Sequence, residues 1–169
     1  ADAALYEVKL RGKRGCLAYQ EGFRLEIRKQ LGFALKDISE NVPSAFIIYR
    51  ADKTDDEILF ANREMIRLTG CEDMDDLLAY TQGSFYNLVR EDERKEVDQS
   101  IWRQIEGGHT NDYVRYDLQR KDGTFLPVLD HGRIVENGRY GKVFYVLIVD
   151  WEAMKRHYFD GDKSLRSEE

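Results

Sequence analysis

The chain has 169 residues, of which 42% are hydrophobic and 34% charged, and its formal net charge is −6. This composition is typical of a globular chain and excludes a disordered one, and the length allows one ordinary domain with flanking segments. Proteins that bind nucleic-acid phosphates usually carry a basic face. The charged residues here predict none, so we expect no nucleic acid among the partners.

The two cysteines, Cys16 and Cys71, form no Cys-x-x-Cys motif and have no histidine at metal-ligand spacing. They predict neither a disulfide framework nor a zinc site, and reduced thiols suit a cytoplasmic protein. No apolar run approaches the ~18 residues that cross a membrane, and no signal-peptide pattern opens the chain. We therefore expect no membrane segment in this chain and a cytoplasmic location, while a longer parent protein could carry an anchor elsewhere.

The first 20 residues predict a short helix followed by a strand. Residues 1–10 have helical spacing and good helix formers, Gly12 and Gly15 end the helix, and residues 16–19 form a strand-like run. Elements this small cannot bury their own apolar faces, so they indicate the edge of another domain.

That edge has a recognisable sequence. Residues 1–15 read Ala-Asp-Ala-Ala-Leu-Tyr-Glu-Val-Lys-Leu-Arg-Gly-Lys-Arg-Gly, which resembles the closing helix and turn of GGDEF domains, the diguanylate cyclase fold. The resemblance implies that residues 1–20 are the C-terminal edge of a GGDEF-like domain. It also implies a parent protein in cyclic-di-GMP signalling, a diguanylate cyclase or a cyclic-di-GMP phosphodiesterase. The family's active-site motif does not occur in this chain, so we assign no catalytic residue.

A second helix is predicted over residues 21–41, in a linker of residues 21–42 that ends before Pro43. Its apolar seam consists of Ile27, Leu31, Ala34 and Ile38. Their spacing of four, three and four is that of a short coiled coil. A helix of barely two heptads is marginal alone in water, so we expect the seam to pack on another surface.

From residue 44 the hydrophobic period changes from 3.6 to 2. The predicted order is two strands (45–50, 58–61), then helical segments (63–69, 73–80, 84–88, 92–106), then three strands (113–120, 124–135, 142–150). Asn62 is a suitable N-cap for the first of these helices, and Gly70 ends it. Asp122-Gly123 is a hairpin turn between the first two of the last three strands.

Three motifs in this part resemble the PAS family. Residues 58–62, Ile-Leu-Phe-Ala-Asn, with Leu68 and Gly70, match the family's entry from strand to helix. Residues 120–123, Arg-Lys-Asp-Gly, followed by Pro127-Val128, match its central hairpin. Val149-Asp150 lies where the family often has an Asp-Ile-Thr exit motif, and Trp151-Glu152 departs from that motif.

The PAS resemblance covers residues 43–152 and implies an α+β fold. It implies a five-stranded antiparallel sheet with short helices on one face, and the N-terminal helix would lie on or near the other. The family's domains are sensory or regulatory modules that bind a small ligand, a cofactor or a second subunit and control a joined output domain. Together with the GGDEF-like start, this implies a module of a multidomain bacterial protein in cyclic-di-GMP signalling.

The identity of any cofactor stays open, but two groups are disfavoured. Haem needs an axial ligand, usually histidine, and the helix at 92–106, where haem-binding relatives often carry it, has none of the three histidines His109, His131 and His157. A covalent flavin of the LOV type needs a cysteine in an Asn-Cys-Arg-Phe-Leu motif, and residues 83–88 contain no cysteine. We also predict no metal site.

Strand alternation predicts two apolar faces for the sheet. The hairpin alignment places one of them under the helices, and the predicted ligand pocket there is Phe60, Met65, Leu68, Val114, Tyr116, Leu118, Val128, Asp130, Val146 and Ile148. A buried carboxylate must be paired or neutralised. Asp130 therefore either contacts a polar ligand or pairs with an arginine or water near its strand end.

The opposite face is also apolar, with Tyr113, Phe125, Leu129, Val143, Tyr145 and Leu147. A sheet with two apolar faces needs a cover on both. We expect the helix at 21–41 to cover this second face, in cis or from a dimer partner, and we predict a homodimer with this helix at or near the interface.

Three hypotheses of function follow. The first is a regulatory module operated by a small ligand or by dimerisation, and the second is a purely structural dimerisation coupler with a filled core. An enzyme is disfavoured because adjacent carboxylates such as Asp55 and Asp56 do not converge on one substrate atom. Residues 153–169 begin as a helix, turn polar and predict a linker to a further domain.

Overall fold

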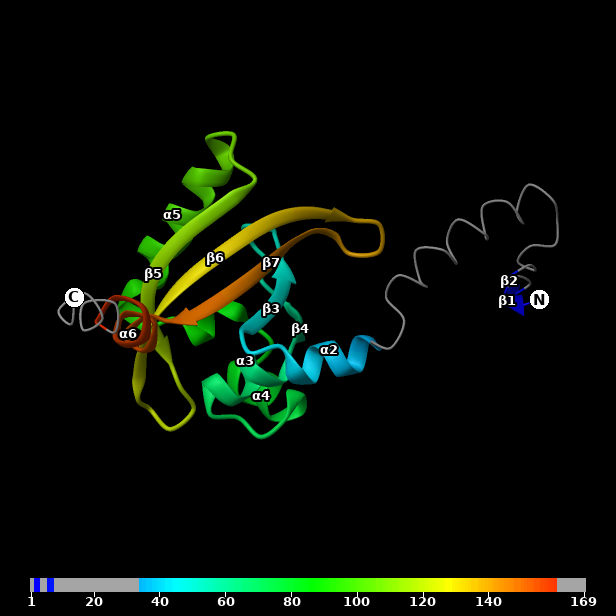
Figure 1. The fold of residues 1–169 in the computed structure, drawn as a ribbon. Coiled ribbons are helices and arrows are strands. Elements are labelled where there is room, and N and C mark those ends of the chain that lie inside the picture. The colour runs from blue at the N-terminus through cyan, green and yellow to red at the C-terminus, as the bar shows by residue number, and fades with distance from the viewer. Residues whose placement is uncertain (1, 4–5, 8–33, 161–169) are drawn as a thin grey trace, which may run out of the picture. The chain divides into compact units, whose positions relative to one another are not determined.

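A computed structural model describes residues 2–3, 6–7 and 34–160 of the chain (Figure 1). The chain divides into two compact units, residues 1–38 and 39–169. In the first unit, β1 (Asp2–Ala3) and β2 (Tyr6–Glu7) pair in parallel. The helix predicted over residues 1–10 is therefore wrong at these four residues, since helix propensity without packing stabilises a short helix little. The strand predicted at 16–19 lies outside the described residues.

The linker helix is described only at its end. Residues 21–33, with Ile27 and Leu31, lie outside the described residues, and α2 (Leu35–Asn41) is the described part of the predicted helix. This helix has no buried residue, and the Ile38 side chain is 46% exposed. Ala34, just before α2, is exposed as well. The described part of the predicted seam is therefore accessible to solvent.

The second unit is built on one antiparallel sheet of five strands in the order β4-β3-β7-β6-β5 (Figure 1). These strands are β3 (Ala45–Arg50), β4 (Ile58–Ala61), β5 (Asn111–Gln119), β6 (Phe125–Asn137) and β7 (Gly141–Asp150). The predicted five-stranded antiparallel sheet is confirmed. The first and last strands in the chain order of this unit, β3 and β7, are neighbours at its centre.

Short helices connect β4 to β5. They are α3 (Arg63–Thr69), α4 (Met74–Thr81), the 3₁₀ turns η1 (Phe85–Leu88) and η2 (Glu91–Glu93), and α5 (Arg94–Glu106). Asn62 caps α3 as predicted, because its side-chain Oδ1 accepts a hydrogen bond from the Met65 N–H at 3.0 Å. Gly70 ends α3 in the left-handed conformation, with φ of 80°.

The core lies between these helices and one face of the sheet, which we call the inner face. Its fully buried side chains come from both layers and include Ile47, Tyr49, Phe144 and Val146 of the sheet and Met65, Leu77, Phe85, Leu88 and Ile101 of the helical layer. The alternation predicted for β5, β6 and β7 is therefore confirmed: Tyr116, Val128 and Ile148 are buried on this face.

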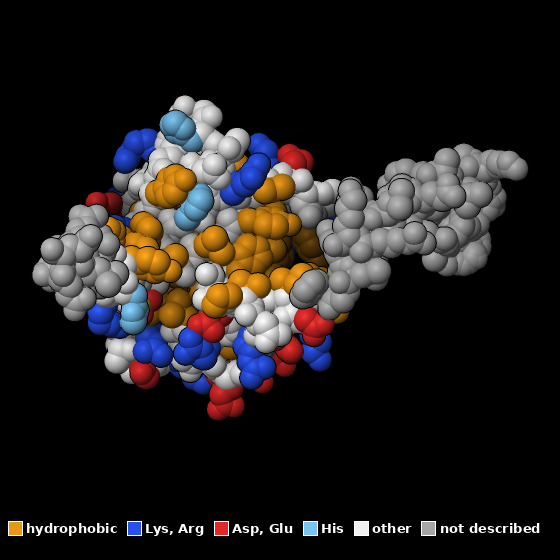
Figure 2. All heavy atoms as spheres, viewed as in Figure 1, with side chains coloured by type: hydrophobic (Ala, Val, Ile, Leu, Met, Phe, Trp, Pro, Cys, Tyr) orange, Lys and Arg blue, Asp and Glu red, His pale blue; other side chains and the backbone are white. Residues whose placement is uncertain are grey.

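The other face of the sheet, the outer face, keeps large apolar side chains exposed. Tyr113 is 56% exposed, Leu147 41% and Tyr145 38%. Figure 2 looks onto this face and shows hydrophobic side chains gathered over the middle strands, with a hollow among them. Phe46 and Phe60 belong to the same face, with ring centroids 6.0 Å apart.

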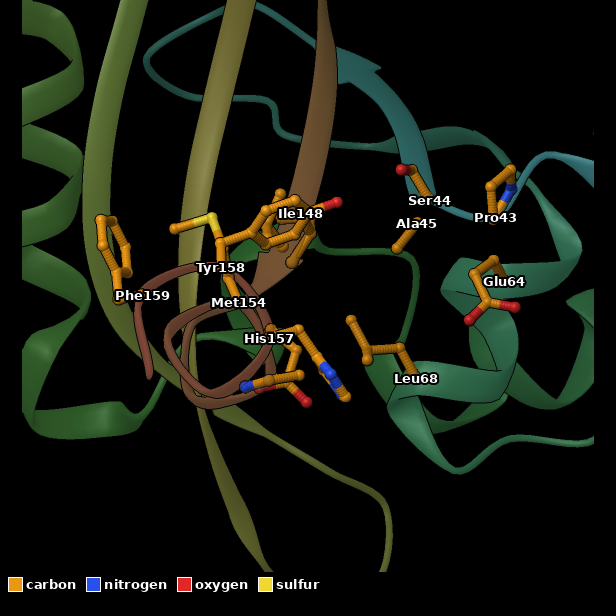
Figure 3. Close-up of a pocket in the computed structure, with 13 residues that line it drawn as sticks. Pro43, Ser44, Ala45, Glu64, Leu68, Ile148, Met154, His157, Tyr158 and Phe159 are labelled. Carbon is orange, nitrogen blue, oxygen red and sulfur yellow. The ribbon is translucent and has the colours of Figure 1, made fainter. Parts of the chain in front are cut away.

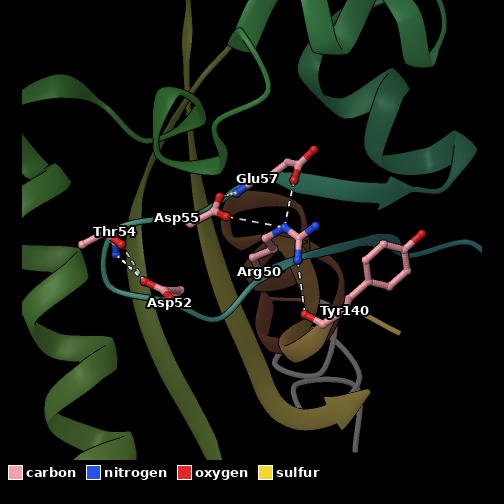
Figure 4. Close-up of polar contacts among 6 residues, drawn as sticks. All are labelled: Arg50, Asp52, Thr54, Asp55, Glu57 and Tyr140. Carbon is pink, nitrogen blue, oxygen red and sulfur yellow. Dashed lines mark hydrogen bonds and ion pairs between the residues drawn. The ribbon is translucent and has the colours of Figure 1, made fainter. Parts of the chain in front are cut away.

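The connection between β3 and β4 is held by polar contacts around Arg50 (Figure 4). Its guanidinium donates a hydrogen bond to Glu57 Oε1 at 2.8 Å and lies 3.5 Å from Asp55 Oδ2. It also donates to the backbone carbonyl of Tyr140 at 3.2 Å. Arg50 thus joins this acidic turn to the turn between β6 and β7.

The exit from the sheet begins at Asp150. Its Oδ1 accepts a hydrogen bond from the Ala153 N–H at 2.9 Å and caps α6 (Trp151–Met154), which continues as the π-helix η3 (Lys155–Asp160). The aspartate therefore caps the exit helix although Trp151 and Glu152 replace the usual motif. Among the helices that the structure describes, none is long and apolar enough to cross a membrane.

Candidate functional site

Two carboxyl groups are buried side by side on the inner face. Asp130 of β6 and Asp112 of β5 are each only 1% exposed. Asp112 lies opposite Gly132 and Asp130 lies opposite Val114 in the β5–β6 register, so the two acids are diagonal neighbours on one face. Tyr116 of β5 donates a hydrogen bond from its hydroxyl to Asp130 Oδ2 at 2.8 Å. We call Asp112, Asp130 and Tyr116 the acidic cluster.

One oxygen of each carboxyl group has no hydrogen-bond partner. These atoms are Asp130 Oδ1 and Asp112 Oδ2, and both are inaccessible to solvent. A buried polar atom without a partner costs roughly 1–3 kcal/mol, and more if it is charged. The unpartnered oxygens of the acidic cluster therefore lower the stability of the folded domain.

Aromatic rings from three further elements belong to the same core as the cluster. Tyr49 of β3 stacks on Phe85 of η1 with ring centroids 4.0 Å apart, and Phe144 of β7 lies 5.3 Å from Tyr49. Tyr86 of η1 makes an edge contact with Tyr49 at 6.3 Å. The negative charge of Asp130 helps to raise the pKa of both the Tyr49 and the Tyr86 hydroxyls, after the larger effect of burial. These hydroxyls therefore lie within electrostatic reach of the acid.

Burial controls the protonation of the two acids. The pKa of Asp130 is raised to about 8, chiefly by burial; the Tyr116 hydrogen bond opposes the rise, and the negative charge of Asp112 adds to it. Burial alone raises the pKa of Asp112 to about 6. Among the described residues, no basic side chain contributes to either shift. Near neutral pH, Asp130 is therefore mostly a neutral acid.

Most residues of the predicted pocket are brought together on the inner face. Met65, Tyr116, Leu118, Val128, Asp130, Val146 and Ile148 are buried in one core, and Leu68 and Val114 pack at its edge. Phe60 is not among them. It pairs with Ile48 and contacts Phe46 on the outer face. Its predicted place in the pocket is wrong because β4 has four apolar residues in a row, so alternation could not fix its parity.

An open groove of about 510 Å³ lies at one end of the sheet (Figure 3). We call it the end groove; it is lined by the start of β3, by α3, by the end of β7 and by α6 and η3. Figure 3 shows Leu68, Met154 and Tyr158 around it. Its lining includes Ile148, the β7 residue that pairs with Asp130. The buried Ile148 therefore lies between the groove and Asp130, and no residue of the acidic cluster lines the groove.

The sequence of residues 58–149 matches the PAS fold family. This match spans more than half of the chain. The chain belongs to the PAS fold family. No curated protein matches the chain.

Solved PAS structures share the fold at low sequence identity. The PAS domain of an HTR-like protein from Haloarcula marismortui is 19% identical with a TM-score of 0.53, over 78% of this chain and 98% of that one. A domain of a sensor histidine kinase/response regulator from Geobacter sulfurreducens is 15% identical with a TM-score of 0.51, over 73% and 95%. A LOV protein from Rhodobacter sphaeroides is 16% identical with a TM-score of 0.52, over 68% and 63%.

The histidines and the cysteine of this PAS domain lie away from the acidic cluster. His131 is on the outer face, stacked on Tyr113 with ring centroids 4.3 Å apart. His109 is exposed after α5, and His157 lines the end groove. Cys71 follows α3 and is buried. Within residues 34–160, no group of three or more metal-ligating side chains comes together.

Asp112 and Gly132 are the parts of the site whose pairing the sequence did not predict. Asp112 is separated from Val114 and Tyr116 by even numbers of residues, so it lies on the same face of β5. Extending the predicted alternation toward the start of β5 would have placed Asp112 on the inner face. The strand was predicted to start at residue 113. A charged residue usually marks the point where the buried part of a strand ends. Asp112 is charged and is nevertheless buried.

Proposed function

We propose that this PAS domain is the sensory or regulatory module of a multidomain bacterial signalling protein in the cytoplasm, which takes up a small ligand on its inner face and controls a joined output domain. Asp130 carries this proposal. A fully buried carboxyl group with an unpartnered oxygen destabilises a domain that has no use for it. A polar ligand that supplies the missing partner would convert this cost into binding energy.

The experiment is to look for that ligand. The purified chain is denatured, and the released small molecules are compared by mass spectrometry with those from Asp130→Asn, together with a visible absorption spectrum. We expect a molecule that native protein releases and the variant does not. Glu136→Gln, on the same strand and exposed, is the control for the charge change. Identical profiles from all three proteins would contradict the proposal.

We also propose that the domain forms a homodimer with the linker helix of residues 21–41 at or near the interface. The exposed apolar side chains of the outer face support this, because large exposed apolar patches usually mark a protein contact. The seam of Ile27, Leu31, Ala34 and Ile38 has the spacing of a coiled coil. Covering the sheet with this helix would link any change in the sheet to the domain before it.

The dimer is tested by light scattering after size exclusion. We expect a dimer for the native chain and a monomer for Leu147→Glu, which places a charge among the exposed apolar side chains of the outer face. Lys142→Glu is the matched control, since Lys142 is exposed on the same strand. A native chain that stays monomeric at high concentration would contradict this proposal.

The alternative function is a structural coupler that dimerises without a ligand. The dense packing of the inner face favours it: Met65, Leu118 and Val128 are at most 1% exposed. A dimer with no released molecule and no visible chromophore would support the coupler over the sensor.

The output is proposed to be cyclic-di-GMP signalling. The support is the GGDEF-like sequence of residues 1–15. The PAS family match begins at residue 58 and does not include these residues. This part of the proposal therefore rests on the sequence motif alone. The test is to express the complete parent protein and assay cyclic-di-GMP synthesis and hydrolysis. Absence of both activities, with the parent protein folded, would contradict it.

A further inference from the structure

The kinds of side chain in and around the acidic cluster bear on the class of ligand. Two carboxyl groups lie as diagonal neighbours on the strands β5 and β6, each with one oxygen unpartnered and buried. The groups with an electrostatic effect on Asp130 are Tyr116 and Asp112. Tyr49 of β3 and Tyr86 of η1 are in turn affected by Asp130. Among the described residues, the cluster therefore gathers acids and phenols without a counter-charge.

Resting on the proposed function, we propose that the ligand is a small organic cation, a primary amine with an apolar body, whose ammonium group pairs with Asp130 and Asp112. An ammonium group carries three donors and no acceptor, which matches the unpartnered oxygens of the two carboxyl groups once Asp130 is ionised. A carboxylate or phosphate ligand would bring a further negative charge beside two acids in a buried site.

The aromatic surroundings favour the same class. Tyr49 and Phe85 are stacked, Phe144 lies beside Tyr49, and Trp102 of α5 makes an edge contact with Phe144 at 5.6 Å. The faces of aromatic rings attract cations, and sites for ammonium ligands use such rings together with acids. These rings and Tyr116 of the acidic cluster belong to one core.

The end groove can hold the apolar body of such a ligand. Leu68, Ala153, Met154 and Tyr158 line it, and most of this lining is apolar. It extends to Ala45 and Ile148, and Ile148 is the cross-strand partner of Asp130. Its volume of about 510 Å³ lies in the range of small-molecule sites. An amine whose body fills the groove would direct its ammonium group inward, toward the acid.

The test uses matched probes that differ only in their head group. Calorimetry on the full chain at pH 7.5 compares 2-phenylethylamine and hexylamine with the corresponding alcohols and with acids of the same body. We expect the amines to bind about tenfold more tightly than the alcohols, as expected for a charge-assisted hydrogen bond in a buried site. In Asp130→Asn this preference should disappear, while in Glu136→Gln it should persist.

A second measurement needs no variant. Amine binding requires ionised Asp130, so the native chain should release a proton on binding, and the measured heat should change with the ionisation enthalpy of the buffer. Amine affinity should also weaken on going from pH 8.5 to pH 6. Equal affinity of amine and alcohol in every matched pair, or amine affinity that rises toward low pH, would overturn the proposal that the ligand is a cation.

The result also separates this inference from the proposed function. If the denatured protein releases a neutral or anionic molecule that Asp130→Asn does not retain, the domain is a sensor and the amine class is wrong. If it releases nothing and no probe shows a head-group preference, both are overturned.

Discussion

The carboxylate of Asp112 occupies the space directly above Gly132. A Cβ atom at position 132 would lie 2.9 Å from Asp112 Oδ2, closer than Cβ atoms come in folded proteins, and 3.1 Å from Oδ1, tighter than most such contacts. A larger residue at position 132 would therefore force the carboxylate on the neighbouring strand to shift. Gly132 leaves room for the buried Asp112 side chain on the inner face.

The first prediction is that Gly132→Ala destabilises the domain by about 1–3 kcal/mol, the usual cost of overpacking a core. In the Asp112→Ala background the same change should cost much less, because the clashing carboxylate is gone. Urea unfolding of the two single variants and the double variant measures this coupling. Gly138→Ala is the control, since no atom lies within 4 Å of the added Cβ. Equal costs of Gly132→Ala in both backgrounds would refute the contact.

The second prediction concerns pH. The unfolded chain releases the Asp130 proton near its ordinary pKa of about 3.9, whereas the folded chain holds it until the pKa of about 8. The folded state binds more protons between these values, so the contribution of Asp130 to the free energy of unfolding is full below about pH 4 and is lost as pH rises through 8. Each pKa unit is worth about 1.4 kcal/mol, so the loss amounts to several kcal/mol.

Asp130→Asn should remove this pH dependence while keeping an acceptor for the Tyr116 hydroxyl. The variant should gain stability relative to the native chain as pH rises from 5 to 8.5, in unfolding experiments at each pH. Asp112, with a pKa of about 6, acts in the same direction over the lower part of the window and is present in both proteins. If the difference between the two proteins stays constant with pH, Asp130 does not carry a raised pKa.

The third prediction concerns Asn62, which joins the sheet to the helical layer. Its Oδ1 accepts hydrogen bonds from the N–H groups of Met65 and Phe46, and its Nδ2 donates to the Ser44 carbonyl at 2.9 Å. Asn62→Ala removes the side-chain partners of one buried and two partly buried backbone groups and should cost about 2–4 kcal/mol. Asp73→Ala, which removes an exposed cap of α4, should cost about 1 kcal/mol. Equal losses would show that the two additional bonds contribute nothing.

These residues show what local sequence could predict. Asn62 and Gly70 each satisfy a requirement of the chain within a few residues, a cap and a left-handed helix end, so sequence alone located them. The inner and outer faces followed from alternation because β5, β6 and β7 are long enough to reveal a period of two. Phe60 lies on a strand of four apolar residues, where pairing with Ile48 sets the face and the sequence pattern does not.

The acidic cluster could be predicted only in part, for a related reason. Asp130 was recognisable because a carboxylate interrupted a predicted apolar row. Its neighbour Asp112 became a buried group only through Gly132, twenty residues further along the chain and opposite in the register. Residues 1–10 have helix propensity, yet Asp2–Ala3 and Tyr6–Glu7 pair as strands, because propensity alone stabilises such a short helix little.

The last prediction concerns the open edge of β5. Gln104 of α5 acts there as a substitute for a sixth strand: its Oε1 accepts a hydrogen bond from the Tyr113 N–H at 3.0 Å, and its Nε2 donates to the Tyr113 carbonyl at 2.9 Å. Unpaired strand edges invite pairing with other chains, and side chains that occupy them prevent it. Gln104→Ala should therefore lower stability by about 1–2 kcal/mol and increase aggregation.

Aggregation is measured by light scattering during slow heating, at equal protein concentrations, beside the exposed control Gln99→Ala on the same helix. The edge argument requires that Gln104→Ala aggregates below its own unfolding midpoint, because the free edge exists in the folded state. Aggregation that begins only with unfolding would mean that Gln104 merely stabilises the contact between α5 and β5. Because Tyr113 is also exposed on the outer face, paired edges would bring two apolar patches together, and the aggregates should be strongly favoured by salt.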